Sequence, residues 1–411
     1  TSLAISRHLP PSPAISHLRS LVLPRPQARG EVFGVRERAE AMMALAPSVL
    51  APLPLPPKPN LSRRIEKLPV GVVLCIAPWN YPLLTAVNCI VPAVLAGNAV
   101  QIKHSSRTPL CGDAFERAFA AAGAPAGIVQ ALHVASGPVL DDVIAMPQVG
   151  FVSFTGSVSA GRKVYSTIAQ SRFIDATLEL GGKDGAYVAR DADVAAAAAG
   201  VVDGAFYNAG QSCCAIERAY VHADVYDEFV AAAVELVNAY HLGDPTDAHT
   251  TMGPLALPSA PDFLRSQVED ALNKGARLLC GGVASSDAHG KGRFFLPTLL
   301  DECDHSMSLM VDESFGPVLG LMKVGSDEEA IELMNDSEFG LTAAVYTSDV
   351  ERAERVARAV DAGTIFMNRC DYLDPYLAWT GAKDSGKGQS LSAHGFDSYT
   401  RLKSLNFKLE P

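Results

Sequence analysis

The sequence VGVVLCIAPWNYP at residues 70–82 gives the first indication of the fold. Residues 70–77 form an unbroken apolar run rich in valine, which is typical of a strand buried on both faces of a parallel sheet. Pro78 and Pro82 then bound a short turn that contains Asn80, because proline cannot continue a strand ladder. A polar loop is therefore expected directly after the carboxyl end of a buried strand.

Strand-like and helix-like segments alternate downstream of this stretch. Further strands are predicted at residues 99–103, 128–133, 149–154 and 175–180. Helices are predicted at residues 83–96, 109–122, 138–146 and from the turn after residue 154 to about residue 170. Repeated β-α-β units with short connections predict an α/β fold with a doubly wound parallel sheet, whose ligands bind beyond the carboxyl ends of its strands.

A second alternating series predicts a second α/β domain. Its strands are expected at residues 218–222, 277–280, 318–324, 343–347 and 364–368. Its helices are expected at residues 225–240, 261–274, 326–336 and 350–360. No internal repeat at the period of a solenoid accompanies either series.

Composition excludes several classes of protein. The 411 residues carry 34 Lys+Arg against 45 Asp+Glu, and a formal net charge of −11 argues against a general nucleic-acid binder or a polybasic membrane-surface protein. No run of 18 apolar residues predicts a membrane span. The eight cysteines include no CxxC pair and no zinc-ligand spacing with histidine, which indicates a reduced, soluble intracellular protein without a metal site.

The amino-terminal segment differs from the rest. Residues 1–30 are rich in serine and arginine and hold no acid before Glu31. This composition is typical either of an organellar (mitochondrial or plastid) transit segment or of a disordered terminus, and in the second case the protein is expected in the cytoplasm. Residues 51–60 (APLPLPPKPN) are proline-rich and are predicted to be a linker.

Four polar loops are candidates for chemistry. In residues 78–82 the Asn80 amide could donate to an oxyanion, although a proline turn alone explains it. Residues 154–161 (FTGSVSAG) could present helix amides to a phosphate, although they also fit an ordinary helix start. In residues 178–183 (LELGGK), Glu179 is flanked by leucines and could act as a general base or lie exposed at a strand end.

The fourth loop contains adjacent cysteines. Residues 207–214 (YNAGQSCC) place them after a glycine and two polar residues, where backbone amides could stabilise a thiolate nucleophile. A buried inert thiol is the competing interpretation.

Together these loops resemble the aldehyde dehydrogenase superfamily in order and spacing, from about Lys67 to Leu409. Residues 313–318 (ESFGPV), Asn368 and residues 383–388 (KDSGKG) extend the resemblance. It implies an NAD(P)-binding domain at 31–50 and 70–181, a catalytic domain at 182–384 and a small β arm for oligomerisation at 51–69 and 400–411. Only 79 residues precede Asn80, so the cofactor domain is expected to be incomplete at its start.

The resemblance also implies a reaction. Cys213 corresponds to the nucleophile, with Cys214 as its structural neighbour, Glu179 to the general base and Asn80 to the oxyanion donor. An aldehyde would be oxidised to a carboxylic acid with NAD or NADP through a Cys213 thiohemiacetal and thioester. The presence of Glu179 favours hydrolysis of that thioester over transfer of the acyl group to coenzyme A.

Further residues take their expected roles from the same resemblance. Leu373 and Trp379 fall where the family builds its aldehyde tunnel, although residues 378–381 read AWTG where PFGG is common. Ser106 replaces a glutamate frequent in NAD-preferring members, so NADP is expected to be tolerated. The residues that correspond to cofactor contacts are Trp79, Lys103, Ser106, Gly156, Ser157, Gly161, Leu180, Glu313 and Phe315.

Two other functions remain open at this level. The chain could be a catalytically silent structural subunit that keeps the fold, or a thiol hydrolase that needs no cofactor. No histidine lies in the motif loops as a partner for the cysteine, which disfavours the hydrolase. The resemblance further implies a homodimer or homotetramer joined through the β arm.

Overall fold

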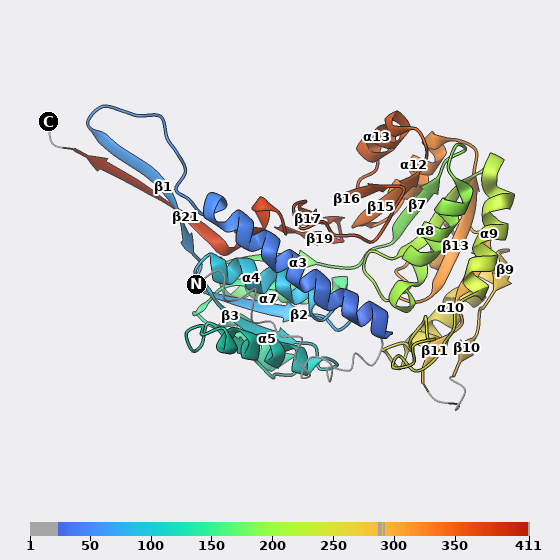
Figure 1. Cartoon of the computed structure of the whole chain (residues 1–411), viewed down its shortest axis with the longest axis horizontal. Helices are drawn as coiled ribbons and strands as arrows, with labels where there is room; N and C mark the ends of the chain where they lie inside the picture. Colours follow the sequence, from blue (N-terminus) through green and yellow to red (C-terminus); the bar gives the residue numbers. More distant parts are fainter. Residues whose placement is uncertain (1–23, 287–289, 291, 410–411) are drawn as a thin grey trace.

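A computed structural model describes residues 24–286, 290 and 292–409. Two α/β lobes lie side by side, and a two-stranded ribbon projects from the first lobe (Figure 1). The two lobes are joined where β6 (Asp175–Glu179) is followed closely by β7 (Asp184–Val188). The catalytic chemistry expected from residues 178–183 therefore falls at this junction.

The first lobe contains a six-stranded sheet. Its order is β19-β6-β5-β2-β3-β4, and all neighbours are parallel except β19 (Gly386–Lys387), which runs antiparallel to β6. The other strands are β2 (Val72–Ala77), β3 (Ala99–His104), β4 (Val129–Ala131) and β5 (Val149–Thr155). The helices are α3 (Arg25–Val49), α4 (Leu84–Leu95), α5 (Pro109–Ala121), α6 (Pro138–Ala145) and α7 (Val158–Ser171).

Strand order in this sheet reverses between β2 and β5. The chain moves from β2 through β3 to β4 on one side and then returns to place β5 on the other side of β2. Parallel sheets bind their ligands at such a switch point, beyond the carboxyl ends of the strands. Residues 78–82 follow β2 and residues 156–157 follow β5, so both loops lie at the switch point.

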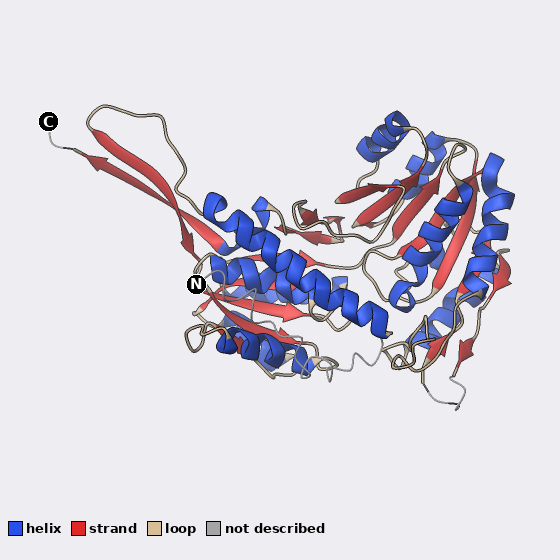
Figure 2. Ribbon diagram, in the orientation of Figure 1, coloured by secondary structure: helices blue, strands red, loops and turns tan. Residues whose placement is uncertain are grey.

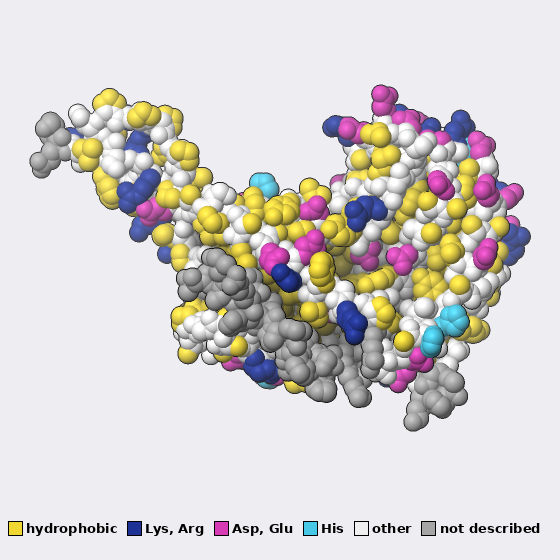
Figure 3. Space-filling view, in the orientation of Figure 1, with side chains coloured by type: hydrophobic (Ala, Val, Ile, Leu, Met, Phe, Trp, Pro, Cys, Tyr) yellow, Lys and Arg dark blue, Asp and Glu magenta, His cyan; other side chains and the backbone are white. Residues whose placement is uncertain are grey.

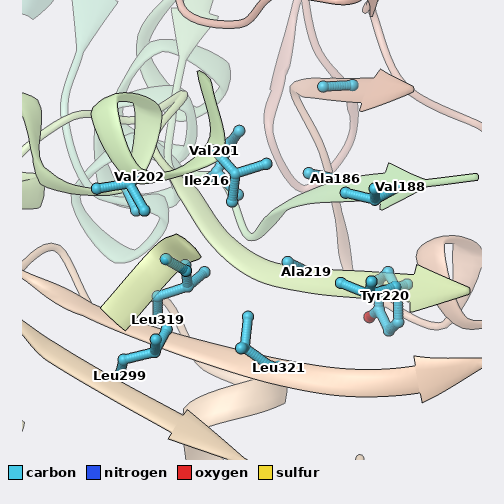
Figure 4. Close-up of a cluster of buried hydrophobic side chains, with 14 of the residues drawn as sticks. Ala186, Val188, Val201, Val202, Ile216, Ala219, Tyr220, Leu299, Leu319 and Leu321 are labelled. Atoms are coloured by element: carbon cyan, nitrogen blue, oxygen red, sulfur yellow. The ribbon is translucent and has the colours of Figure 1, made fainter. Parts of the chain in front are cut away.

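The second lobe contains a seven-stranded sheet of order β16-β15-β7-β8-β13-β12-β9, parallel except at β9 (Arg277–Cys280). Its core packs apolar side chains of the central strands against α8 (Val194–Phe206) (Figure 4). The remaining strands are β8 (Ile216–His222), β12 (Thr298–Asp301), β13 (Val318–Val324), β15 (Thr342–Tyr346) and β16 (Thr364–Met367). The remaining long helices are α9 (Tyr226–Asn238), α10 (Ala260–Asn273), α12 (Asp327–Asn335) and α13 (Val350–Ala359).

The projecting ribbon pairs β1 (Leu61–Pro69) with β21 (Thr400–Lys408) in antiparallel register from Leu61↔Lys408 to Pro69↔Thr400 (Figure 2). Its side chains are mostly exposed or half-buried, because no other layer of the chain covers it. Residues 61–69 and 400–408 of the predicted arm segments at 51–69 and 400–411 therefore pair in space.

The predicted α/β fold class with doubly wound parallel sheets is confirmed. Several elements had no counterpart in the prediction, among them β7, α8 and β12. Helix α3 begins at Arg25, inside the segment assigned to a leader or a disordered terminus, and residues 1–23 lie outside the described residues. Among the helices that the structure describes, none is long and apolar enough to cross a membrane.

Candidate active site

The cysteine loop is held in an unusual backbone conformation. Asn208, Ala209 and Gly210 all have left-handed φ angles, of 53°, 56° and 68°. Asn208 and Gln211 stabilise this turn reciprocally, since Asn208 Nδ2 donates to Gln211 O at 3.1 Å and Gln211 Nε2 donates to Asn208 O at 3.0 Å. The turn leaves Cys213 half-buried and accessible at its end, while Cys214 is buried.

The loop after β2 is joined to the cysteine loop through Asn80. This buried side chain donates from Nδ2 to Gln211 O at 3.2 Å, and Asn208 Nδ2 donates to Asn80 O at 3.2 Å. The Asn80 amide therefore contacts the backbone two residues before Cys213. It can donate a second hydrogen bond to an oxygen that develops charge beside the thiol.

Glu179 reaches the same region from the end of β6. The Ser390 hydroxyl donates to Glu179 Oε1 at 2.5 Å. Burial raises the pKa of the Glu179 carboxyl, and the Ser390 hydrogen bond and the charge of Arg38 oppose that rise. The backbone just beyond Glu179 runs beside the cysteine loop, because a Cβ at Gly182 would lie 2.2 Å from Cys213 O.

An apolar wall completes the surroundings of the thiols. Buried Trp379 and half-buried Leu373 pack in one cluster with Cys213 and Cys214. Trp379 in β17 (Trp379–Thr380) pairs with Ser390 in β20 (Gln389–Ser390), the residue that contacts Glu179. One short strand pair therefore links the expected tunnel wall to the expected base.

Three side chains lie near the junction of the two sheets. The rings of Trp79 and Phe315 meet edge to face, with centroids 5.6 Å apart. Glu313 Oε1 accepts from the Gly182 N–H at 3.1 Å, and a Cβ at Gly181 would lie 2.6 Å from the Glu313 carboxylate. Burial, and then the charge of Glu217, raise the pKa of Glu313 to about 7.

The switch point of the first sheet fits a dinucleotide. Ser157 caps α7 by accepting from Ala160 N, so the remaining first-turn N–H groups can face a phosphate. A Cβ at Gly161 would lie 2.5 Å from a methyl of Leu180, which places the start of α7 directly against that residue. Gly156 N donates to Glu179 O at 3.0 Å. The start of α7 therefore packs closely against the end of β6 and Leu180.

Two polar residues lie at the end of β3 in the same sheet. Lys103 is buried, its Nζ donates to Ser136 Oγ at 3.1 Å, and burial lowers its pKa. Ser106 lies exposed in the turn that follows. No cluster of three metal-ligating side chains occurs within the described ranges.

Comparison with known proteins agrees with this geometry. Residues 18–405 match the aldehyde dehydrogenase family. The chain belongs to the aldehyde dehydrogenase family. A protein named aldehyde dehydrogenase from Paenarthrobacter nicotinovorans is 37% identical over 391 residues, which is 94% of this chain and 83% of the relative. A succinate-semialdehyde dehydrogenase [NADP(+)] 1 from Mycobacterium bovis is 37% identical over 370 residues, 90% of this chain and 79% of the relative.

Solved aldehyde dehydrogenase structures have the same fold. Betaine aldehyde dehydrogenase from Staphylococcus aureus, in complex with NAD+, superposes with a TM-score of 0.93 at 31% identity, covering 100% of this chain and 82% of the other. A 3,6-anhydro-L-galactose dehydrogenase in complex with NADP superposes with a TM-score of 0.92 at 32% identity, covering 98% and 86%.

This aldehyde dehydrogenase brings together the residues that the sequence singled out. Cys213, Asn80 and Glu179 meet at the junction of the two lobes, next to Leu373 and Trp379. The expected cofactor contacts follow strands of the first sheet or lie near the junction of the two sheets, and they comprise Trp79, Lys103, Ser106, Gly156, Ser157, Gly161, Leu180, Glu313 and Phe315. Their individual roles remain predictions.

The sequence did not assign a role to the ion pair behind this site. Lys183 Nζ lies 2.6 Å from Glu217 Oε2, and both side chains are almost fully buried. Glu217 also accepts from the backbone N–H groups of Ser314 and Phe315, at 2.7 and 2.8 Å. The pair therefore fixes the loop that carries Glu313 and Phe315. A carboxylate at the start of the buried strand at 216–222 was the signal available in the sequence.

Proposed function

We propose that this chain oxidises an aldehyde to a carboxylic acid with NAD+ or NADP+, and that Cys213 is the nucleophile. The observation that carries the proposal is the convergence of the accessible Cys213, the Asn80 amide and the Glu179 carboxylate at one junction. The NADP(+) in the name of the Mycobacterium bovis relative and the NAD+ bound to the Staphylococcus aureus enzyme support the choice of cofactor.

The Cys213 thiolate adds to the aldehyde carbon, and the carbonyl oxygen becomes an oxyanion. Asn80 Nδ2 and the Cys213 backbone N–H are the donors that stabilise it. Removing one donor of this kind costs about 10²–10³-fold in rate. The nicotinamide, when bound, accepts the hydride that leaves this carbon. The carbonyl re-forms as a Cys213 thioester.

Glu179 then completes the cycle. Its carboxylate removes a proton from a water that attacks the thioester, Cys213 leaves as a thiolate and the carboxylic acid is released. The raised pKa makes Glu179 a stronger base than an exposed carboxylate. Ser390 orients the carboxylate through its hydrogen bond.

The cofactor site is assigned to the junction of the two sheets and the switch point. Lys103 and Ser106 would hold the adenosine ribose, the start of α7 the pyrophosphate and Glu313 the nicotinamide ribose. Trp79 and Phe315 would line the ring site. Serine at position 106 leaves the 2′-position without a repelling carboxylate, which accommodates NADP+.

We also propose that copies of the chain associate through the ribbon of β1 and β21. Isolated two-stranded ribbons are marginally stable in water. Figure 3 shows hydrophobic side chains exposed along this ribbon. Leu402 and Phe407 on β21 are 65% and 49% exposed. A second copy would cover these side chains and the open strand edges.

The test is formation of reduced nicotinamide by the purified chain with NAD+ or NADP+ and short, long and aromatic aldehydes. Cys213→Ser is expected to lower turnover by about 10³-fold or more, since a hydroxyl is a far weaker nucleophile than a thiolate. Cys280→Ser, at a half-buried thiol on the edge strand β9, is the matched control and should keep turnover. A folded wild-type chain without turnover, or full activity in Cys213→Ser, would overturn the proposal.

A further inference from the structure

His104 is a buried histidine at the carboxyl end of β3. It is 6% exposed and directly follows Lys103, the residue proposed to contact the adenosine ribose. In the register of the sheet it lies opposite Ala77, the last residue of β2. His104 therefore lies where the chain leaves β2 toward Asn80 and leaves β3 toward Ser106.

Both ring nitrogens of His104 have partners, and these partners lie on two different loops. Nδ1 accepts from the N–H of Ser105 at 3.1 Å and lies 3.0 Å from the Thr108 hydroxyl. Because a backbone N–H can only donate, Nδ1 carries no proton, and the proton of the neutral ring is on Nε2. Nε2 therefore donates to Pro82 O at 2.8 Å. One imidazole thus bridges the turn after β3 and the loop after β2.

The residues at the two ends of this bridge have little else to hold them in place. Thr108 is the N-cap residue of α5, a position where a threonine hydroxyl normally accepts from an N–H of the first helical turn. In the described part of the chain its side chain forms no such cap. Pro82 has no backbone N–H, so its carbonyl is the only backbone hydrogen-bonding group that it offers. The Thr108 hydroxyl is therefore used to hold the turn to the imidazole instead of to start the helix.

The loop that His104 holds carries the proposed oxyanion donor. Pro82 lies two residues after Asn80. The Asn80 Nδ2 donates to Gln211 O, and its backbone O accepts from Asn208 Nδ2, both on the cysteine loop. Asn80 is thus held from the second lobe, while His104 holds the residues just beyond it from the first sheet.

His104 does not change its charge near neutral pH. Burial lowers its pKa to about 4, the hydrogen bond to Pro82 O opposes this, and the charge of Lys103 acts in the same direction as burial. A neutral ring keeps one donor and one acceptor. The bridge is therefore a fixed support and not a pH switch.

We propose that His104 is a positioning residue, which holds the Asn80 loop with one ring nitrogen and the ribose turn at residues 105–108 with the other. Nε2–H affects the rate, because it places the loop of the oxyanion donor. Nδ1 affects cofactor affinity, because it holds the turn that carries Ser106. This assignment rests on the proposed aldehyde oxidation and its proposed cofactor site.

Two amide variants separate the two arms. In His104→Asn the side-chain oxygen can take the place of Nδ1, but no group reaches Pro82 O. In His104→Gln the longer side chain can bring an N–H to the place of Nε2, but the acceptor beside Ser105 and Thr108 is lost. Turnover is measured with the best aldehyde of the short, long and aromatic set. Calorimetry measures the Kd of whichever cofactor, NAD+ or NADP+, the wild type binds more tightly.

The two variants should differ in opposite ways. His104→Asn should lower kcat by about 10- to 100-fold and leave the cofactor Kd within about 2-fold, since a misplaced oxyanion donor slows the reaction without changing the ribose turn. His104→Gln should raise the cofactor Kd by about 10-fold and leave kcat within about 3-fold. His104→Phe, which removes both arms, should show both losses while its melting curve shows a folded protein.

His222→Asn is the matched control. His222 is a histidine at the end of β8, it is 4% exposed, and its Nδ1 accepts from the Asp224 N–H at 3.1 Å. Because β8 begins beside the cysteine loop, its far end lies away from the site. This variant should keep the wild-type kcat and Kd. Equal losses in His104→Asn and His104→Gln, or wild-type values in both, would overturn the assignment.

The binding measurement distinguishes a failure of this assignment from a failure of the proposed function. A wild-type chain that binds cofactor but oxidises no aldehyde would refute the proposed reaction. The Kd of His104→Gln divided by that of His104→Asn would then still decide the role of Nδ1, since a ratio of about 10 supports it and a ratio near one overturns it. Wild-type turnover with an unchanged kcat in His104→Asn would refute the role of Nε2 and keep the reaction. A folded wild-type chain that binds neither cofactor would refute the cofactor site and this assignment together.

Discussion

Replacing Glu31 by glutamine should remove a pH dependence from the stability of the fold. Glu31 is 6% exposed and lies on α3, and its Oε1 accepts from the N–H groups of Leu83 and Leu84, at 2.8 and 3.2 Å. These N–H groups open α4, directly after the Asn80 loop, and have no acceptor within their own helix. Glutamine keeps an acceptor oxygen in this position, so Glu31→Gln changes the ionisation and little else.

The size of the effect follows from the pKa. Burial raises the pKa of Glu31 from an ordinary value of 4.5 to about 7. Between these values the folded chain holds a proton that the unfolded chain has released. The stabilisation of the fold by the protonated Glu31 is therefore complete below pH 4.5 and is lost as the pH rises through 7. The free energy of unfolding falls by about 3 kcal/mol in all, and by about 2.5 kcal/mol between pH 5 and 8.

Urea unfolding of wild type and Glu31→Gln at pH 5, 6, 7 and 8 measures this contribution, because other groups titrate alike in both proteins. The free energy of unfolding of wild type should fall relative to the variant by about 2.5 kcal/mol across the series. Glu40→Gln, which removes an exposed carboxylate from the same helix, should show no such trend. A difference in unfolding free energy between wild type and the Glu31→Gln variant that stays constant with pH would refute the reasoning.

Three further predictions concern other parts of the molecule. Lys183→Met leaves the buried Glu217 carboxylate without its cationic partner, so the free energy of unfolding in urea should fall by about 3–5 kcal/mol. A loss below about 1 kcal/mol would contradict the pairing. Ser106→Glu places a carboxylate at the proposed ribose site and should lower kcat/KM for NADP+ relative to NAD+ by about 100-fold, whereas an unchanged ratio would remove Ser106 from that site. Leu402→Asp charges the exposed ribbon, so sedimentation should detect a smaller assembly than wild type; identical species would argue against association there.

Much of the fold could be predicted because its signals are local. The eight apolar residues at 70–77 contain β2, and the prolines that follow end it within one residue of the predicted position. The helix at 109–122 was predicted almost to its ends because Pro109 starts it and Gly123 follows it. Hydrophobic periodicity and the prolines and glycines that bound helices and strands depend only on neighbouring residues, so both signals can be recognised in a single sequence.

Strand β7 could not be predicted, because its signal is not local. It has five residues and begins with Asp184 and Gly185, which are poor strand formers. The Asp184 carboxylate is nevertheless buried, and it accepts from the N–H and the hydroxyl of Thr342 on β15, at 3.1 and 2.5 Å. These donors lie 158 residues away in the sequence, so only the assembled sheet explains the strand.

The burial of Arg38, which lies on α3 and is 8% exposed, was missed for a related reason. Its neighbours Arg36 and Glu40 are exposed and paired with each other, and a charged stretch of helix normally faces water. In the structure Arg38 instead packs against α4 and donates to Leu84 O. The sequence pattern alone does not distinguish such a packed arginine from one on a solvated helix face. The cysteine loop was recognised more easily because its residues stand together in the sequence.

The position of the site between two sheets explains why so many buried polar contacts surround it. The ends of β2, β5 and β6 supply Asn80, the start of α7 and Glu179, while the starts of β8 and β13 follow Cys213 and Phe315. Four residues, 180–183, connect β6 to β7, so the two sheets meet without a long linker. The contacts from Glu313 to Gly182 and from Asn80 to Gln211 cross this junction. A small shift of one sheet against the other would move the Cys213 thiol away from the proposed oxyanion donor and the proposed base, and the rate should fall even with every one of these residues intact.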